Sequence, residues 1–86
     1  MTKEIVNRRI AAVTAAYNKL PAAPVLMSAG WSSNEALKVS LEISKIAAKI
    51  QNAIFAVIFD DFDGASLIIN DAFTQISNLL NGIIRH

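Results

Sequence analysis

Cysteine is absent from the 86-residue chain, so disulfide bonds and metal sites built from thiolates are excluded. The single histidine is His86, and the three glycines stand apart from one another. The sequence therefore offers no histidine-assisted nucleophile and no glycine-rich phosphate loop. We expect no enzymatic activity, no bound metal and no cofactor. The lack of cysteine also favours a cytoplasmic location.

Charge and long apolar runs are scarce as well. Charged residues make up 17% of the chain, against about 25% in an average soluble domain, and the net charge is +1. So small a charge gives no general attraction to nucleic acid or to an anionic membrane. The longest apolar run covers residues 53–59, whereas a membrane-spanning helix needs roughly 20 apolar residues. With 53% apolar residues, the composition predicts one small domain that associates with itself or with another protein.

Residues 33–59 predict one long central helix around which the rest of the chain is organised. Its charged residues recur every three or four positions and fall on one stripe. Two apolar stripes follow the same period, and a helix that rests on a single neighbour shows only one. We therefore expect this helix to be packed on both flanks. The first apolar stripe comprises Val39, Ile43, Ile46, Ile50, Ala53 and Val57, and the second comprises Leu37, Leu41, Ala48, Phe55 and Phe59.

A first helix is predicted over residues 3–20, where an apolar seam runs from Val6 to Leu20 at alternating steps of four and three. Pro21 and Pro24 end it, because proline donates no backbone hydrogen bond. Residues 21–32 then form a linker that is unusually apolar for a loop. Met27 and Trp31 of this linker are candidates for binding a partner, although Trp31 also fits a structural position beside the N-terminal cap of the central helix.

A third helix is predicted over residues 64–84, with Asp63 as its cap, because acidic residues are favoured at a helix N-terminus. One face of this helix is apolar, and the opposite face carries amides and hydroxyls with scarcely any charge. An uncharged polar face can be buried against another subunit at lower desolvation cost than a charged one. The candidate interaction residues here are Phe62 at the acidic turn, Leu67, which stands alone on the polar face, and Asn70, Thr74 and Asn78.

Three other interpretations deserve mention. Residues 53–69 are also compatible with a β-hairpin, but the helical period continues across them and favours helix. The acidic turn does not fit a calcium loop of the EF-hand type, because with Gly64 as the central glycine the first and last ligand positions hold Phe59 and Asn70. Lys38, Lys45 and Lys49 could contact phosphates, but glutamates in the same stripe cancel much of that field, so nucleic acid is disfavoured.

These observations predict an all-α fold, a three-helix up-down-up bundle with a long central helix, completed by homodimerisation through its second and third helices. The expected function is non-catalytic: a small helical protein that acts by protein–protein interaction, as an inhibitor, an adaptor or an assembly subunit. The first alternative is a membrane-active or self-assembling structural protein, which a requirement for detergent or the formation of filaments would favour. The second is a weak nucleic-acid-binding module, which salt-sensitive binding to mixed DNA or RNA would favour.

Overall fold

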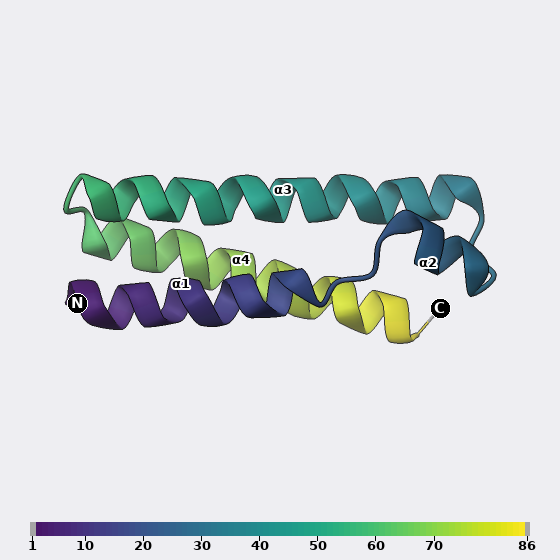
Figure 1. Ribbon diagram of the computed structural model, residues 1–86, viewed down its shortest axis with the longest axis horizontal. Coiled ribbons are helices and arrows are strands. Elements are labelled where there is room, and N and C mark those ends of the chain that lie inside the picture. Colours follow the sequence, from purple (N-terminus) through teal and green to yellow (C-terminus); the bar gives the residue numbers. More distant parts are fainter. Residues whose placement is uncertain (1, 86) are drawn as a thin grey trace.

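The computed structural model describes residues 2–85, which form four helices and no strand. The helices are α1 (Lys3–Asn18), α2 (Ala23–Ser28), α3 (Ser33–Ile58) and α4 (Phe62–Ile84). In Figure 1, α1 and α4 run in one direction and α3 runs in the opposite direction. This is the expected up-down-up order of the three long helices. The described part is a rod of 44 × 17 × 15 Å with a radius of gyration of 14.2 Å. A compact chain of this length would have about 12 Å.

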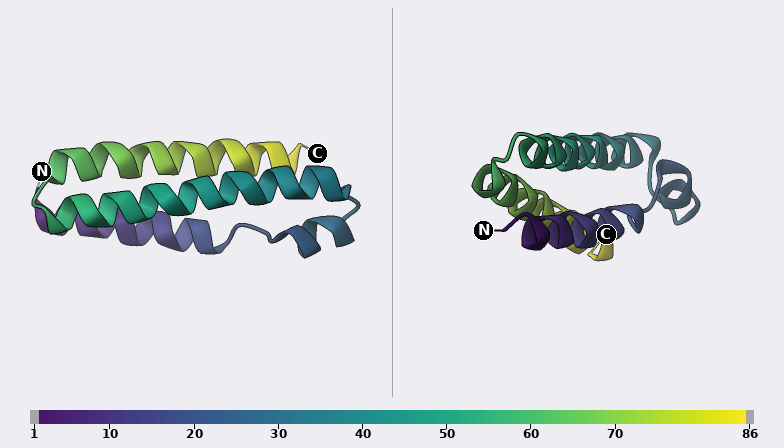
Figure 2. Two further views of the ribbon diagram at one scale, coloured as in Figure 1. Left: turned by 90° about the horizontal axis from the view of Figure 1, so that it is seen from above. Right: turned by 60° about the vertical axis from the view of Figure 1, so that its left-hand side comes forward.

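The core lies along one side of α3, where α1 and α2 follow each other end to end while α4 runs beside the whole helix (Figure 2). At one end Val6 of α1 packs with Val57 and Ala65. At the other end Leu26 of α2 packs with Ala36 and Val39. The first apolar stripe of α3 is thus the one that the fold buries. Between the two ends lies the largest buried cluster, formed by Val13, Ile46, Ile50, Ala53, Ile69, Ala72 and Ile76.

One polar contact connects α1 with α4 at the edge of this core. Arg9 Nη1 donates a hydrogen bond of 3.1 Å to Ser66 Oγ, and Ser66 is the one polar side chain among the described residues that is classed as buried. Arginine can reach it because the aliphatic part of the side chain lies along the apolar surface while the guanidinium stays near water. The buried hydroxyl is therefore satisfied, and it helps to fix α4 relative to α1.

The N-terminus of α3 is closed by a capping box. The backbone N–H of Glu35 donates to Ser32 Oγ at 3.2 Å, and the backbone N–H of Ser32 donates to Glu35 Oε1 at 3.2 Å. We expect Ser32→Ala to lower the free energy of unfolding by about 1 kcal/mol, because one end of the longest helix loses a hydrogen-bond acceptor. Urea unfolding followed by circular dichroism measures this change. Ser33→Ala is the matched control, since Ser33 is the first helical residue and not the cap; equal losses in both variants would contradict the prediction.

The expected linker over residues 21–32 is wrong in one respect, because it contains the short helix α2. Pro24 lies in the first turn of α2, where the missing N–H costs nothing. The helix ends in a Schellman motif, in which Gly30 N–H donates to Met27 O and Trp31 N–H donates to Leu26 O, both at 3.1 Å. Gly30 has the positive φ of 99° that this motif requires at its left-handed position.

The boundaries of the longer helices also differ from the prediction. The first helix ends at Asn18, two residues before the expected Leu20, because the residue before Pro21 is disfavoured in the helical region. Asp61 rather than Asp63 caps the last helix, and Asp61 Oδ1 accepts a hydrogen bond of 3.0 Å from Gly64 N–H. A Cβ atom at Gly64 would lie 2.2 Å from Asp61 Oδ2, so glycine leaves room for this cap.

A second Schellman motif lets Asp61 end one helix and begin the next. Asp60 N–H donates to Val57 O at 3.0 Å, and Asp61 N–H donates to Ala56 O at 2.8 Å. Asp60 takes the left-handed position with a φ of 62°, a conformation that aspartate tolerates better than most residues. The chain therefore changes direction between α3 and α4 within three residues, 59–61. Both segments are helical, so the alternative of a β-hairpin over residues 53–69 is wrong.

Candidate protein-binding surface

The second apolar stripe of α3, formed by Leu37, Leu41, Ala48, Phe55 and Phe59, is exposed. We call it the outer stripe. Leu41 and Phe59 each follow a buried valine by two positions, which corresponds to about 200° around a helix, so they point away from the core. Their exposed fractions are 55% and 80%, while Leu37 and Phe55 are 58% and 55% exposed. The prediction that α3 is packed on both flanks is therefore not met within one copy of the chain.

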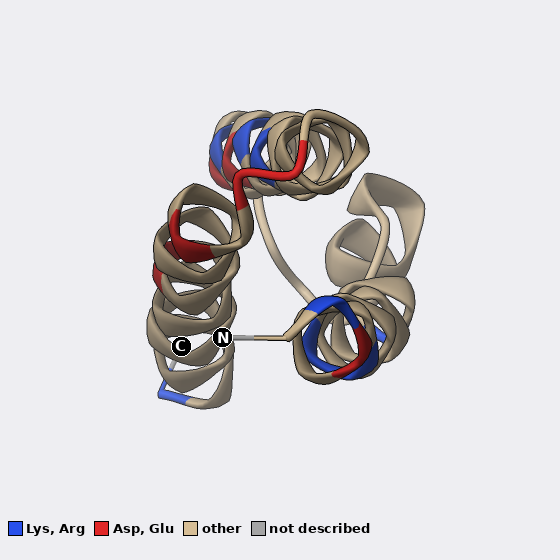
Figure 3. Ribbon diagram, turned by 90° about the vertical axis from the view of Figure 1, so that its left-hand side faces the viewer, with Lys and Arg blue, Asp and Glu red and all other residues tan. Residues whose placement is uncertain are grey.

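The fold explains why this face stays uncovered. Three helices already surround the core face of α3, and Figure 3 shows α1, α2 and α4 below it while its outer side has no neighbour. Covering a second face would need another long helix, which the described residues do not supply. Exposed apolar side chains gathered on one face and bordered by polar residues are typical of interaction sites. Aromatic residues such as Phe55 and Phe59 are enriched at protein interfaces.

Charged residues of α3 lie on the side of this helix toward α4, as the coloured ribbon in Figure 3 shows. Lys49 pairs with Asp71 of α4, and Lys45 pairs with Glu42 at 3.3 Å along the helix. Both are surface pairs, which typically contribute about 0–1 kcal/mol each. Their main effect is to border the outer stripe with polar groups on one side, where Lys38 and Lys45 are the nearest charges by helical position.

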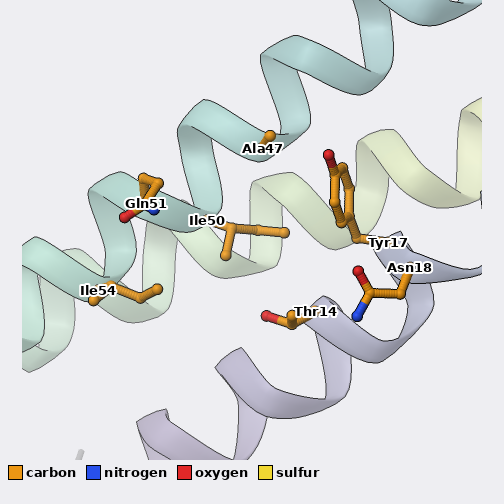
Figure 4. Close-up of a pocket in the computed structure, with 7 residues that line it drawn as sticks. All are labelled: Thr14, Tyr17, Asn18, Ala47, Ile50, Gln51 and Ile54. Carbon is orange, nitrogen blue, oxygen red and sulfur yellow. The ribbon is translucent and has the colours of Figure 1, made fainter.

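A shallow hollow of about 240 Å³ lies between α1 and α3 (Figure 4). Pockets for small ligands usually measure about 300–1,000 Å³, so this one is small. It contains no charged group, and its hydroxyl and amide groups have no acid or base beside them that would perform proton transfer. Gln75 Oε1 of α4, a buried acceptor without a hydrogen-bond partner, does not line it. The lining residues are Thr14, Tyr17, Asn18, Ala47, Ile50, Gln51 and Ile54.

The residues that the sequence analysis selected lie on three separate surfaces. In the linker, Met27 is half exposed, while Trp31 packs beside the cluster of Leu26, Ala36 and Val39. At the acidic turn, Phe62 packs against the cluster that contains Val57.

On the outer side of α4, Leu67 is 73% exposed, and three polar candidates lie on the same face. Within this group the Thr74 hydroxyl donates to Asn70 O at 3.1 Å, so it already has a partner inside its own helix. The structure brings together only the α4 group, which comprises Leu67, Asn70, Thr74 and Asn78.

The outer stripe was missing from those candidates although its residues were recognised as a stripe. The signal was available: two apolar stripes on opposite sides of one helix require more neighbours than three helices provide. The candidates came instead from the apolar linker, the acidic turn and the polar face of the last helix. Of these, Leu67 is exposed, whereas Trp31 and Phe62 are partly buried against the core.

Among residues 2–85, no group of three or more histidine, cysteine, aspartate or glutamate residues is arranged to hold a metal ion. No helix in the same range is long and apolar enough to cross a membrane. Comparison of the chain with protein-family models, with curated proteins and with solved structures found no match in any of the three.

Proposed function

We propose that this chain is a non-catalytic helical protein that acts by binding protein, as an inhibitor, an adaptor or an assembly subunit, and that the outer stripe of α3 is its binding surface. A cytoplasmic location, an independence of cofactors and the formation of a homodimer belong to the same proposal. One observation carries it: four large apolar side chains, each more than half exposed, lie along the face of α3 opposite the core.

The exposed apolar area of the outer stripe is a source of binding energy. Burying apolar surface contributes roughly 25 cal/mol per Å², so four large side chains supply several kcal/mol if a partner covers them. Two of them are phenylalanines, which bury a large area and have few rotatable bonds to immobilise. A partner with an apolar helix or groove would fit this surface, because a helix face of this kind is commonly recognised through residues about one or two turns apart.

Site-specific photocrosslinking in cells that express the chain tests this proposal. Phe55 is replaced by p-benzoylphenylalanine in one variant and Phe73 in another. The two positions are similarly exposed, at 55% and 50%, but Phe73 lies on α4 away from the outer stripe. We expect protein adducts from position 55 and far fewer from position 73. Adducts with lipid alone would favour the membrane-active alternative, and equal protein adducts from both positions would contradict the assignment of the binding surface.

A further inference from the structure

We propose that the partner which covers the outer stripe is a second copy of this chain, packed α3 against α3 in antiparallel orientation, with the two-fold axis at Ala48. This inference deepens the proposed function and rests on it, because it takes the outer stripe as the binding surface and names the occupant. It is narrower than the dimer expected from the sequence, since the face of α4 has no part in it.

The spacing of the outer stripe is symmetric about Ala48. Leu41 and Phe55 are each 7 residues from Ala48, and Leu37 and Phe59 are each 11 residues from it. At about 1.5 Å per residue these distances correspond to roughly 10 and 16 Å along the helix in each direction. A two-fold axis through Ala48 therefore places each leucine at the level of a phenylalanine of the second copy. Such a self-complementary surface is what an isologous dimer interface requires.

The sizes of the side chains fit the same arrangement. The central residue is alanine, and the nearest stripe residues, Leu41 and Phe55, are each about two turns away. A small residue at the point where two helices cross lets their backbones approach closely, with interaxial distances of about 8–10 Å. The larger leucine and phenylalanine side chains then fill the space on both sides of the crossing. Each copy contributes two leucines and two phenylalanines, so the interface has four contacts, each between a leucine of one copy and a phenylalanine of the other.

Charge selects the antiparallel orientation. Lys38 lies beside the stripe near its N-terminal end, while the exposed acids Asp60 and Asp61 lie just beyond its C-terminal end. The two-fold axis is perpendicular to the plane that contains both helices. The same flank of the outer stripe therefore lies on the same side of this plane in both copies. The two-fold axis also brings Lys38 to the level of Ile58 of the second copy, two residues before Asp60 in the chain. A parallel pair would instead place the acidic turns of both copies together, where like charges repel.

The N-terminal glutamates do not cancel this complementarity. Glu35 lies about 140° around the helix from the middle of the outer stripe, toward α4, and it takes part in the capping box with Ser32. Glu42 lies about 120° from the stripe and pairs with Lys45. The charges nearest to the stripe are thus Lys38 and Lys45, and both are positive.

The area available predicts a dimer that dissociates readily. From Leu37 to Phe59 the stripe extends about 33 Å, and a helix with its side chains is about 10–12 Å wide. Two such faces bury roughly 700–800 Å² in total, which is below the 1,200–2,000 Å² of a typical stable complex and within the range of transient ones. We therefore expect a dissociation constant on the order of micromolar. For this reason the dimer should be trapped by a disulfide bond as well as detected by its mass in sedimentation.

Disulfide trapping is direct because the chain has no cysteine of its own. In Ala48→Cys the new thiol lies on the proposed two-fold axis. With Cα atoms about 2.3 Å from helix axes that are about 10 Å apart, the two Cα atoms would be about 5.4 Å apart, which a disulfide can bridge. We expect mild oxidation to convert this variant to a covalent dimer. The control is Asn78→Cys on the outer face of α4, which should stay monomeric; faster dimerisation at position 78 would overturn the inference.

A second pair of variants tests the orientation. Leu41→Cys and Phe55→Cys should each form little disulfide alone, because two copies of position 41 would lie about 21 Å apart in the antiparallel dimer. An equimolar mixture of the two variants should form the mixed disulfide. Crosslinking of each variant with itself, without preference for the mixed product, would indicate a parallel pair and would overturn the two-fold axis at Ala48.

The charge pairing is tested by sedimentation of the full chain over a hundredfold range of concentration. We expect Lys38→Glu to raise the dimer dissociation constant about tenfold at low salt, because two attractions become repulsions, and the effect to shrink in 1 M salt. Lys45→Glu is the matched control, since position 45 lies at the level of the uncharged Gln51 of the second copy. Equal weakening by both variants would contradict the pairing. A wild-type chain that stays monomeric throughout would overturn the second copy as occupant, whereas protein adducts from position 55 would still support the outer stripe as a surface that binds another protein.

Discussion

Replacement of Ile46 by alanine is expected to lower the free energy of unfolding by about 2–5 kcal/mol. Ile46 has no exposed surface and lies in the largest buried cluster, which joins α1, α3 and α4. Removing three carbon atoms there loses their transfer free energy and leaves a cavity that the surrounding helices fill only in part. For a domain whose total stability is about 5–15 kcal/mol, such a loss leaves the fold marginal.

Ile84→Ala is the matched control, because Ile84 lies on α4 but is 80% exposed. We expect it to change the free energy of unfolding by no more than about 0.5 kcal/mol. Urea unfolding at one fixed protein concentration measures both variants, since association would make the stability depend on concentration. If Ile84→Ala cost as much as Ile46→Ala, the position of the core along α3 would be wrong.

Enlargement of Ala53 to leucine is expected to have the second largest effect, a loss of about 1–3 kcal/mol. Ala53 of α3 and Ala72 of α4 are both fully buried in the same cluster. Small residues at these positions allow the two helices to lie close together. A leucine side chain at position 53 would force the helices apart or push neighbouring side chains out of their preferred rotamers.

The measurement is the thermal midpoint, which for a domain of this size falls by about 4–8 °C for each kcal/mol lost. Ala12→Leu provides the control, because Ala12 is exposed on α1 and the added side chain meets no packed neighbour. A midpoint that stays unchanged in Ala53→Leu would show that α3 and α4 are separated by more space than the structure describes.

The sequence predicts the three long helices and the two apolar stripes of α3 because each rests on a period that spans many residues. Val39, Ile46 and Val57 recur in phase over five turns. One polar residue within such a stripe would therefore not obscure its helical period. The short helix α2 was missed for the opposite reason: six residues complete too few turns to show a period. The cap of α4 was misplaced because Asp60, Asp61 and Asp63 are chemically alike, and only the Schellman motif decides which of them begins the helix.

Which apolar stripe of α3 is buried could not be read from composition. Both stripes consist of aliphatic and aromatic residues at helical spacing, and periodicity alone does not rank them. The choice depends on how many helices are available to cover them. It also depends on α1 and α2 sharing one side of α3 instead of occupying two, which follows from the turn at residues 19–22.

The placement of α1 and α2 end to end has a consequence for how the molecule fluctuates. Helix α2 has six residues, too few to be stable in water by itself, and its one buried side chain is Leu26. It can therefore detach while α1, α3 and α4 remain folded, and the surface around Ala36 and Val39 is then uncovered. Backbone amides near this end of the rod should exchange with solvent at lower free-energy cost than those beside Ile46. The protein thus has a graded stability along its length, with one end that opens before the whole unfolds.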